Sequence, residues 1–97
     1  MTPTARLAAA LAAYRPGDPR WQQQSSFNEV RRAAEALAEK LAETEARLHA
    51  QWDWLEANGD SPEHDDRERG WLALNDRYEA AHRLLGEATA MLKEATR

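Results

Sequence analysis

Small and apolar residues recur at alternating steps of three and four in two long stretches of the chain, residues 27–55 and 71–95. This spacing places them along one face of a helix and predicts two long amphipathic helices. Residues 58–62, Asn-Gly-Asp-Ser-Pro, separate the stretches and have the composition of a turn. The two helices are therefore expected to fold back on each other, within one molecule, as an antiparallel hairpin.

The positions that repeat at these steps form the expected seam between the two helices. In the first stretch they are Phe27, Val30, Ala34, Leu37, Leu41, Thr44, Leu48, Gln51 and Leu55, and in the second Trp71, Leu74, Tyr78, Ala81, Leu85, Ala88, Leu92 and Ala95. A tight turn would place Leu41 opposite Ala81 and Thr44 opposite Tyr78. Large side chains then meet small ones, as a close-packed interface requires.

A short helix is expected before the hairpin, at about residues 4–14. This segment is rich in Ala, and Leu7 and Leu11 lie on one of its faces. The sequence Arg-Pro-Gly at residues 15–17 ends it. Its apolar face is expected to pack antiparallel on the open end of the hairpin, where the two long helices leave apolar residues uncovered.

The start of the second helix has two candidates in the sequence. Asp18 followed by Pro19 is one helix-start signal, and the capping box that begins at Ser26 is another. The fold class predicted is all-α: a long, coiled-coil-like antiparallel helical hairpin with a short N-terminal helix on its open end. One domain is expected over residues 1–97, with helices at about 4–14, 19–57 and 62–96.

Composition excludes several classes of function. The chain of 97 residues has no Cys, so it can form neither disulfides nor thiolate metal sites, and we expect a cytoplasmic location. Its 17 acidic and 13 basic residues include no basic stripe, which argues against a nucleic-acid partner. No apolar run approaches the ~20 residues that a membrane-spanning helix needs, so no membrane partner is expected.

Four large apolar residues near the turn form the main candidate for a binding site. The expected first helix, about 16 Å long, is too short to reach them. Large exposed aromatic side chains usually mark contact surfaces, and Trp is enriched in binding hot spots. We therefore expect a non-enzymatic protein-interaction or adaptor module whose tip binds a second protein or a copy of itself, the simplest assembly being a homodimer of hairpins. The partner-binding residues predicted are Trp52, Trp54, Trp71 and Leu72.

One pair of residues offers an alternative, metal-dependent function. Glu79 and His82 form a Glu-x-x-His step, which resembles the encapsulated ferritins, whose di-iron sites form when two hairpins pair. The resemblance implies a di-iron enzyme with a further ligand from the second helix, Glu43 or Glu39. The predicted seam, however, turns Glu79 outward and leaves His82 at its flank. This favours a solvated helix face on which Glu79 pairs with Arg83.

Catalytic and cofactor-binding motifs are not recognisable in the sequence. No nucleophile has a base linked to it by sequence, and no Gly-rich loop could hold a phosphate. We predict no catalytic residue and no cofactor, and the metal-dependent reading is kept as the alternative.

Overall fold

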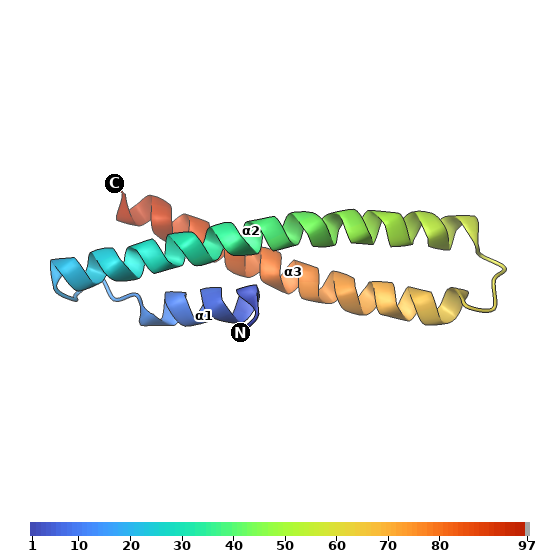
Figure 1. Cartoon of the computed structure of the whole chain (residues 1–97), viewed down its shortest axis with the longest axis horizontal. Coiled ribbons are helices and arrows are strands. Elements are labelled where there is room, and N and C mark those ends of the chain that lie inside the picture. The colour runs from blue at the N-terminus through green and yellow to red at the C-terminus, as the bar shows by residue number, and fades with distance from the viewer. Residues whose placement is uncertain (97) are drawn as a thin grey trace.

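The computed structural model describes residues 1–96 and confirms the predicted all-α hairpin. These residues form three helices and no strand: α1 (Pro3–Ala13), α2 (Arg20–Ala57) and α3 (His64–Ala95). Helices α2 and α3 run antiparallel, and the molecule measures 61 × 22 × 14 Å (Figure 1). None of the three helices combines the length and the hydropathy needed to cross a bilayer.

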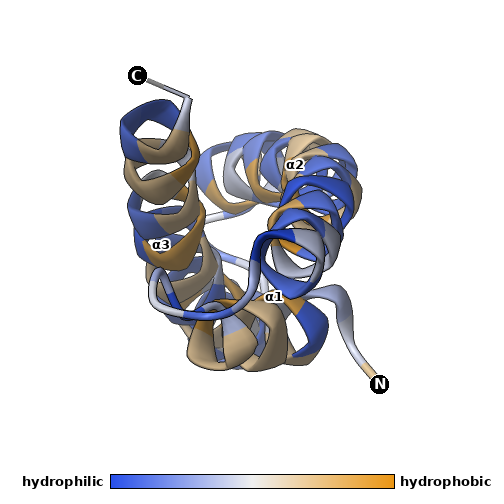
Figure 2. Ribbon diagram, turned by 90° about the vertical axis from the view of Figure 1, so that its left-hand side faces the viewer, coloured by the Kyte–Doolittle hydropathy of each residue, from blue (hydrophilic) through white to orange (hydrophobic). Residues whose placement is uncertain are grey.

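Helix α1 packs on the open end of the hairpin, as predicted. It contacts both long helices and lies beside the first half of α2, with its N-terminus near the middle of the hairpin (Figure 1). Viewed along the long axis, the three helices surround one interior (Figure 2). Leu7 is fully buried there, and Leu11 and Tyr14 pack against the same core. The turn end of the hairpin is left with two helices only.

The seam predicted from the three–four spacing is the one that the structure buries. All nine seam positions of α2 are buried or half-buried, and on α3 the small residues Ala81 and Ala88 are buried. Leu41 and Thr44 line the same hollow as Tyr78 and Ala81, which agrees with the predicted register. Ala95 is an exception, because it is the last residue of α3 and is exposed.

An ion pair fastens the start of α1 to α2. Arg6 Nε donates a hydrogen bond to Glu29 Oε1 at 2.9 Å. This bond lowers the pKa of Glu29 and raises that of Arg6, because it favours the charged form of each group. At the other end of α1, the side-chain amide of Gln23 donates to the carbonyl of Pro16 at 2.7 Å. Helix α1 is thus tied to α2 near its start and, through Pro16, just after its end.

Helix α2 begins at Arg20, near the earlier of its two predicted starts. Pro19 is the N-cap residue and has no side-chain capping bond, while its carbonyl accepts the first helical bond, from the Gln23 N–H at 2.9 Å. Ser26 therefore lies inside the helix rather than capping it. The Gln-rich stretch at residues 22–24 is helical.

Helix α3 begins two residues later than its predicted start at about residue 62. The hydroxyl of Ser61 accepts a hydrogen bond from the Glu63 N–H at 3.3 Å, and its carbonyl accepts one from the His64 N–H at 3.1 Å. These bonds form a turn that delays the helix. In its first turns Arg67 pairs with Glu63, and the i,i+4 spacing of this pair supports the helix.

Candidate functional site

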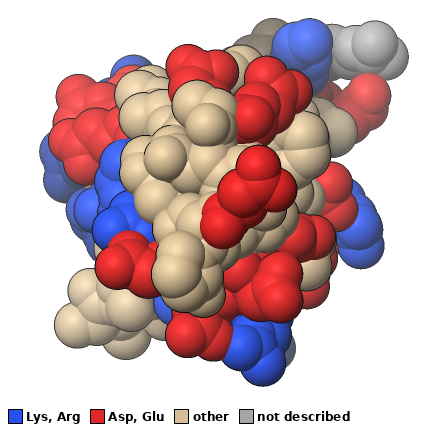
Figure 3. Space-filling model, turned by 90° about the vertical axis from the view of Figure 1, so that its right-hand side faces the viewer, with Lys and Arg blue, Asp and Glu red and all other residues tan. Residues whose placement is uncertain are grey.

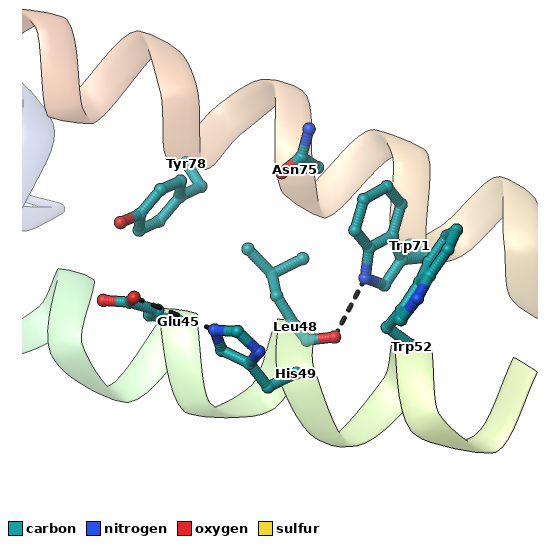
Figure 4. A pocket seen from close by; sticks show the side chains of 7 residues that line it. All are labelled: Glu45, Leu48, His49, Trp52, Trp71, Asn75 and Tyr78. Atoms are coloured by element: carbon teal, nitrogen blue, oxygen red, sulfur yellow. Dashed lines mark hydrogen bonds and ion pairs between the residues drawn. The ribbon is translucent and has the colours of Figure 1, made fainter. Parts of the chain in front are cut away.

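The distal half of the hairpin, residues 45–57 of α2 and 64–79 of α3, contains an open groove between the two helices. Its cavity has a volume of about 360 Å³ and contains no part of α1. Figure 4 shows side chains from both helices pointing into it, with Leu48 between Tyr78 and the indole of Trp71. The groove is lined by Glu45, Leu48, His49, Trp52, Trp71, Asn75 and Tyr78.

Trp71 and Trp52 form one end of this groove. The half-buried Trp71 donates a hydrogen bond from Nε1 to the backbone carbonyl of Leu48 at 2.9 Å, which joins α3 to α2 (Figure 4). The ring of Trp52 lies against it, with centroids 5.0 Å apart and planes tilted by 50°. Trp52 is 44% exposed, and its Nε1 donates to Glu56 Oε1 at 2.7 Å. Both indole donors are thus satisfied, and the exposed ring surface is available for apolar contact.

The groove continues in both directions along the same side of the hairpin. Towards the tip, Trp52 also lines a hollow of about 230 Å³, together with His64 and Glu68. Towards the open end, Tyr78 also lines a hollow of about 410 Å³, together with Glu79 and His82. We call the residues that line these three hollows the groove face. Six of its eight α3 positions, 64, 68, 71, 75, 78 and 82, recur at steps of three and four, so they form one stripe on that helix.

Carboxylates without a Lys or Arg partner surround the groove. Four glutamates have only neutral donors or His as polar contacts within the described residues: Glu45, Glu56, Glu68 and Glu79. All three histidines of the chain lie on this face: His49 is 3.8 Å from Glu45, His64 is 3.6 Å from Glu68, and His82 contacts the ring of Tyr78. Arg83 is the one Lys or Arg among the residues lining the three hollows.

The turn end of the hairpin is also strongly acidic. Residues 53–69 contain seven carboxylates and two arginines, a net charge of −5, whereas the whole chain has a net charge of −4. Figure 3 looks onto this end and shows acidic side chains spread across it, with basic ones towards the margins. The negative charge of the protein is therefore concentrated beside the aromatic groove.

Two of the four predicted partner-binding residues are in contact, a third borders the same face, and the fourth lies apart from them. Trp52 and Trp71 are in contact, and Leu72, 48% exposed, follows Glu68 by four positions and precedes Asn75 by three, so it borders the groove face. Trp54 lies on the other side of α2 in a separate hollow with Gln51, where the Arg67 guanidinium is 4.3 Å from its ring centroid. Residues two positions apart on a helix lie on different flanks, but the spacing of Trp52 and Trp54 does not show which of them Trp71 joins.

The polar residues that line the groove were not predicted from the sequence. Glu45 and His49 stand one turn apart and flank the seam residue Leu48, and Asn75 follows the seam residue Leu74. Once the register of the hairpin is known, this adjacency to seam positions is the signal that could have found them. Tyr78 had been assigned only to the seam, yet its ring also lines the groove.

The residues of the alternative metal site make other contacts in the chain. Glu43 pairs with Lys40 at 3.6 Å, and Glu79 accepts a hydrogen bond from Asn75 at 3.4 Å, not the expected contact with Arg83. Within the described residues, Glu43, Glu79 and His82 do not form a group of adjacent ligands. His82 packs beside the ring of Tyr78 at 5.9 Å instead.

A different trio of possible ligands meets at the first turn of α3. The side-chain atoms of His64, Asp65 and Glu68 lie within 4.8 Å of one another, and the two carboxylates are exposed. Acidic side chains are favoured at a helix N-terminus by the helix dipole. This accounts for the cluster without a metal ion.

Comparison with known proteins adds no functional assignment. No protein-family model matches the chain, and searches of curated proteins and of solved structures find no significant match. The functional inference therefore rests on the residues of the chain itself.

Proposed function

We propose that this chain is a non-enzymatic protein-interaction module that binds a partner protein through the groove face of its distal half. The observation that carries the proposal is the pair of partly exposed indoles, Trp52 and Trp71, on an open groove that α1 does not cover. Indole rings supply large contact areas with little loss of conformational entropy, and they dominate many binding hot spots. Leu72 adds an exposed apolar side chain at the border of the same face.

The rigidity of the hairpin supports this role. Trp71 is fixed between the helices by its bond to Leu48, and Trp52 rests on it, so the groove is formed before a partner arrives. A preformed site loses less conformational entropy on binding than a flexible one. The proposal also includes a cytoplasmic location, which is supported by the lack of Cys.

Self-association belongs to the proposal as a second mode of binding. Two hairpins could cover more apolar surface than one, but a symmetric dimer that joined two groove faces would bring their unpartnered carboxylates together. Like charges facing each other at an interface are unfavourable. We therefore propose a different protein as the main occupant of the groove.

A site-specific crosslinking experiment in the native host tests the proposal. A photoreactive benzoylphenylalanine in place of Leu72 should give one discrete adduct with a partner protein, because position 72 borders the groove. The matched control carries the same group in place of Ala80, which is exposed on α3 away from the groove. Equal adducts from both positions, or none from position 72, would remove the proposal, and an adduct of twice the mass of the chain would identify self-association.

A further inference from the structure

We infer that the occupant of the groove face is a basic amphipathic helix of the partner protein. This inference rests on the proposed function and adds the chemistry of the partner to it. It follows from three features of the groove: its charge, its aromatic floor and its length.

The negative charge of the groove face favours a cationic partner. Four glutamates surround the groove without a Lys or Arg partner in the described chain, and the neighbouring tip adds further carboxylates. An anionic or neutral segment would leave these charges uncompensated, whereas Lys and Arg side chains could reach them from the rim. Such complementary charge speeds association and selects between partners.

The floor of the groove favours apolar side chains on the same segment of the partner. The apolar side chains of Leu48, Trp71 and Tyr78 line this floor, with Leu48 between the two rings (Figure 4). Apolar side chains buried there would remove this surface from water. A Lys or Arg of the partner can also lie over an indole face, and the chain already contains one such contact, between Arg67 and Trp54 at 4.3 Å.

The length of the groove face fits a helix. Its stripe on α3 runs from residue 64 to residue 82, which is about 27 Å along the helix axis. A helix of about 18 residues has the same length. A helix laid along the distal half would complete a helical bundle there, as α1 does on the open end.

The opposite edge of the hairpin carries basic residues. Lys40 and Arg47 lie on α2 beyond Thr44, away from Glu45, and with Arg77 they line the hollow beside the N-terminus of α1. Charge is thus divided between the two edges of the hairpin. A second copy could in principle place this basic edge on the groove face, and sedimentation would detect it as self-association.

Calorimetric titration of the full chain with model peptides tests the inference. The probe is a helical peptide of about 18 residues built from Leu and Lys at amphipathic spacing. Two controls accompany it: a peptide of the same pattern with Glu in place of Lys, and an oligolysine of equal length. The Leu/Lys peptide should bind and the two controls should not, and the binding should weaken as salt is added.

Two sets of matched variants locate the binding. The triple variant Glu45→Gln, Glu68→Gln and Glu79→Gln should bind the Leu/Lys peptide about tenfold more weakly. The control triple variant changes the net charge by the same amount at exposed positions outside the groove and should bind like the unaltered chain; it combines E35Q, E39Q and E87Q. Trp52→Ala should weaken binding at least about 30-fold, and Trp54→Ala should not.

The possible outcomes separate this inference from the proposed function. Equal weakening by the two triple variants would mean attraction to net charge alone and would overturn the inference. Binding of the Leu/Glu peptide as tightly as the Leu/Lys peptide, or no binding of either, would also overturn it. In each of these cases a discrete adduct from position 72 would still support the proposed function. Concentration-dependent dimers that are weakened by Trp52→Ala and by the groove triple variant, but not by the control triple variant, would assign the groove to a second copy and overturn the inference as well.

Discussion

At the scale of single residues, the two indoles of the groove have different structural roles. Trp71 is half-buried and bonds across the hairpin to the Leu48 carbonyl, whereas Trp52 is more exposed and bonds within its own helix to Glu56. Trp71 therefore stabilises the groove by joining α3 to α2, whereas the ring of Trp52 is exposed for contact with a partner. The sequence predicted both as partner-binding residues, but it could not separate these roles, because the spacing does not show where a side-chain donor points.

Replacement of each Trp by Phe should reveal the difference. Trp71→Phe removes a partly buried hydrogen bond between helices and should lower the free energy of unfolding by about 0.5–1.5 kcal/mol. Trp52→Phe removes an exposed bond and should lower it by about 0.5 kcal/mol or less. Urea unfolding followed by circular dichroism measures both. A larger loss from Trp52→Phe would contradict the assigned roles.

The Arg6–Glu29 pair predicts a pH dependence of stability. The hydrogen bond from Arg6 lowers the pKa of Glu29 in the folded chain, so folding is favoured wherever Glu29 is ionised. The contribution is complete above the ordinary range of a Glu carboxyl and is lost as the pH falls through the lowered pKa. Glu29→Gln should melt below the unaltered chain at neutral pH, and the difference should vanish in strong acid. Glu35→Gln, at an exposed position without an ion pair in the described chain, should show no such convergence.

At the scale of helices, the sequence predicted the middle of each element better than its ends. The seam of α2 follows from the three–four spacing because burial acts on every turn. The starts of α2 and α3 depend on local hydrogen bonds at Pro19 and Ser61, and for α2 the capping box at Ser26 was a competing signal. Arg69 pairs with Asp66 at i,i+3 rather than with Asp65 at i,i+4, and the spacing alone does not decide between these adjacent carboxylates.

The glycines of α3 give a test of helix propensity. Gly70 and Gly86 lie inside the helix with negative φ, and a Cβ at either position would meet no atom within 4 Å. Gly70→Ala and Gly86→Ala should each raise the free energy of unfolding by about 0.5–1 kcal/mol, because Ala loses less backbone entropy. Ala80→Gly, at an exposed position of the same helix, should lower it by a similar amount. A decrease from Gly70→Ala in urea unfolding would show that α3 is not a regular helix there.

At the scale of the whole molecule, α1 divides the hairpin into a three-helix half and a two-helix half. The sequence predicted this division, because α1 is too short to reach the turn. It did not predict that the uncovered half would present an aromatic groove on one side and place Trp54 under Arg67 on the other. Which flank each side chain occupies depends on the rotation of two packed helices about their axes, which is a property of the assembled hairpin.

The division predicts unequal effects of Leu→Ala substitutions in the two halves. Leu7 is fully buried between α1 and the hairpin, so Leu7→Ala should lower the free energy of unfolding by about 2–5 kcal/mol. Leu72 is exposed beside the groove, and Leu72→Ala should change it by about 0.5 kcal/mol or less. Denaturant midpoints compare the two directly. A loss of similar size for both would mean that the distal half is covered in the free protein.

The claim that the groove face is the binding surface is tested most directly by the indole N–H signals of the four tryptophans, followed by NMR during titration with the Leu/Lys peptide. The signals of Trp52 and Trp71 should shift, because these rings line the groove. Those of Trp54, on the other side of α2, and Trp21, 75% exposed near the start of α2, should stay in place. Shifts of Trp54 or Trp21 equal to those of Trp52, or no shift of Trp52 and Trp71, would contradict the account.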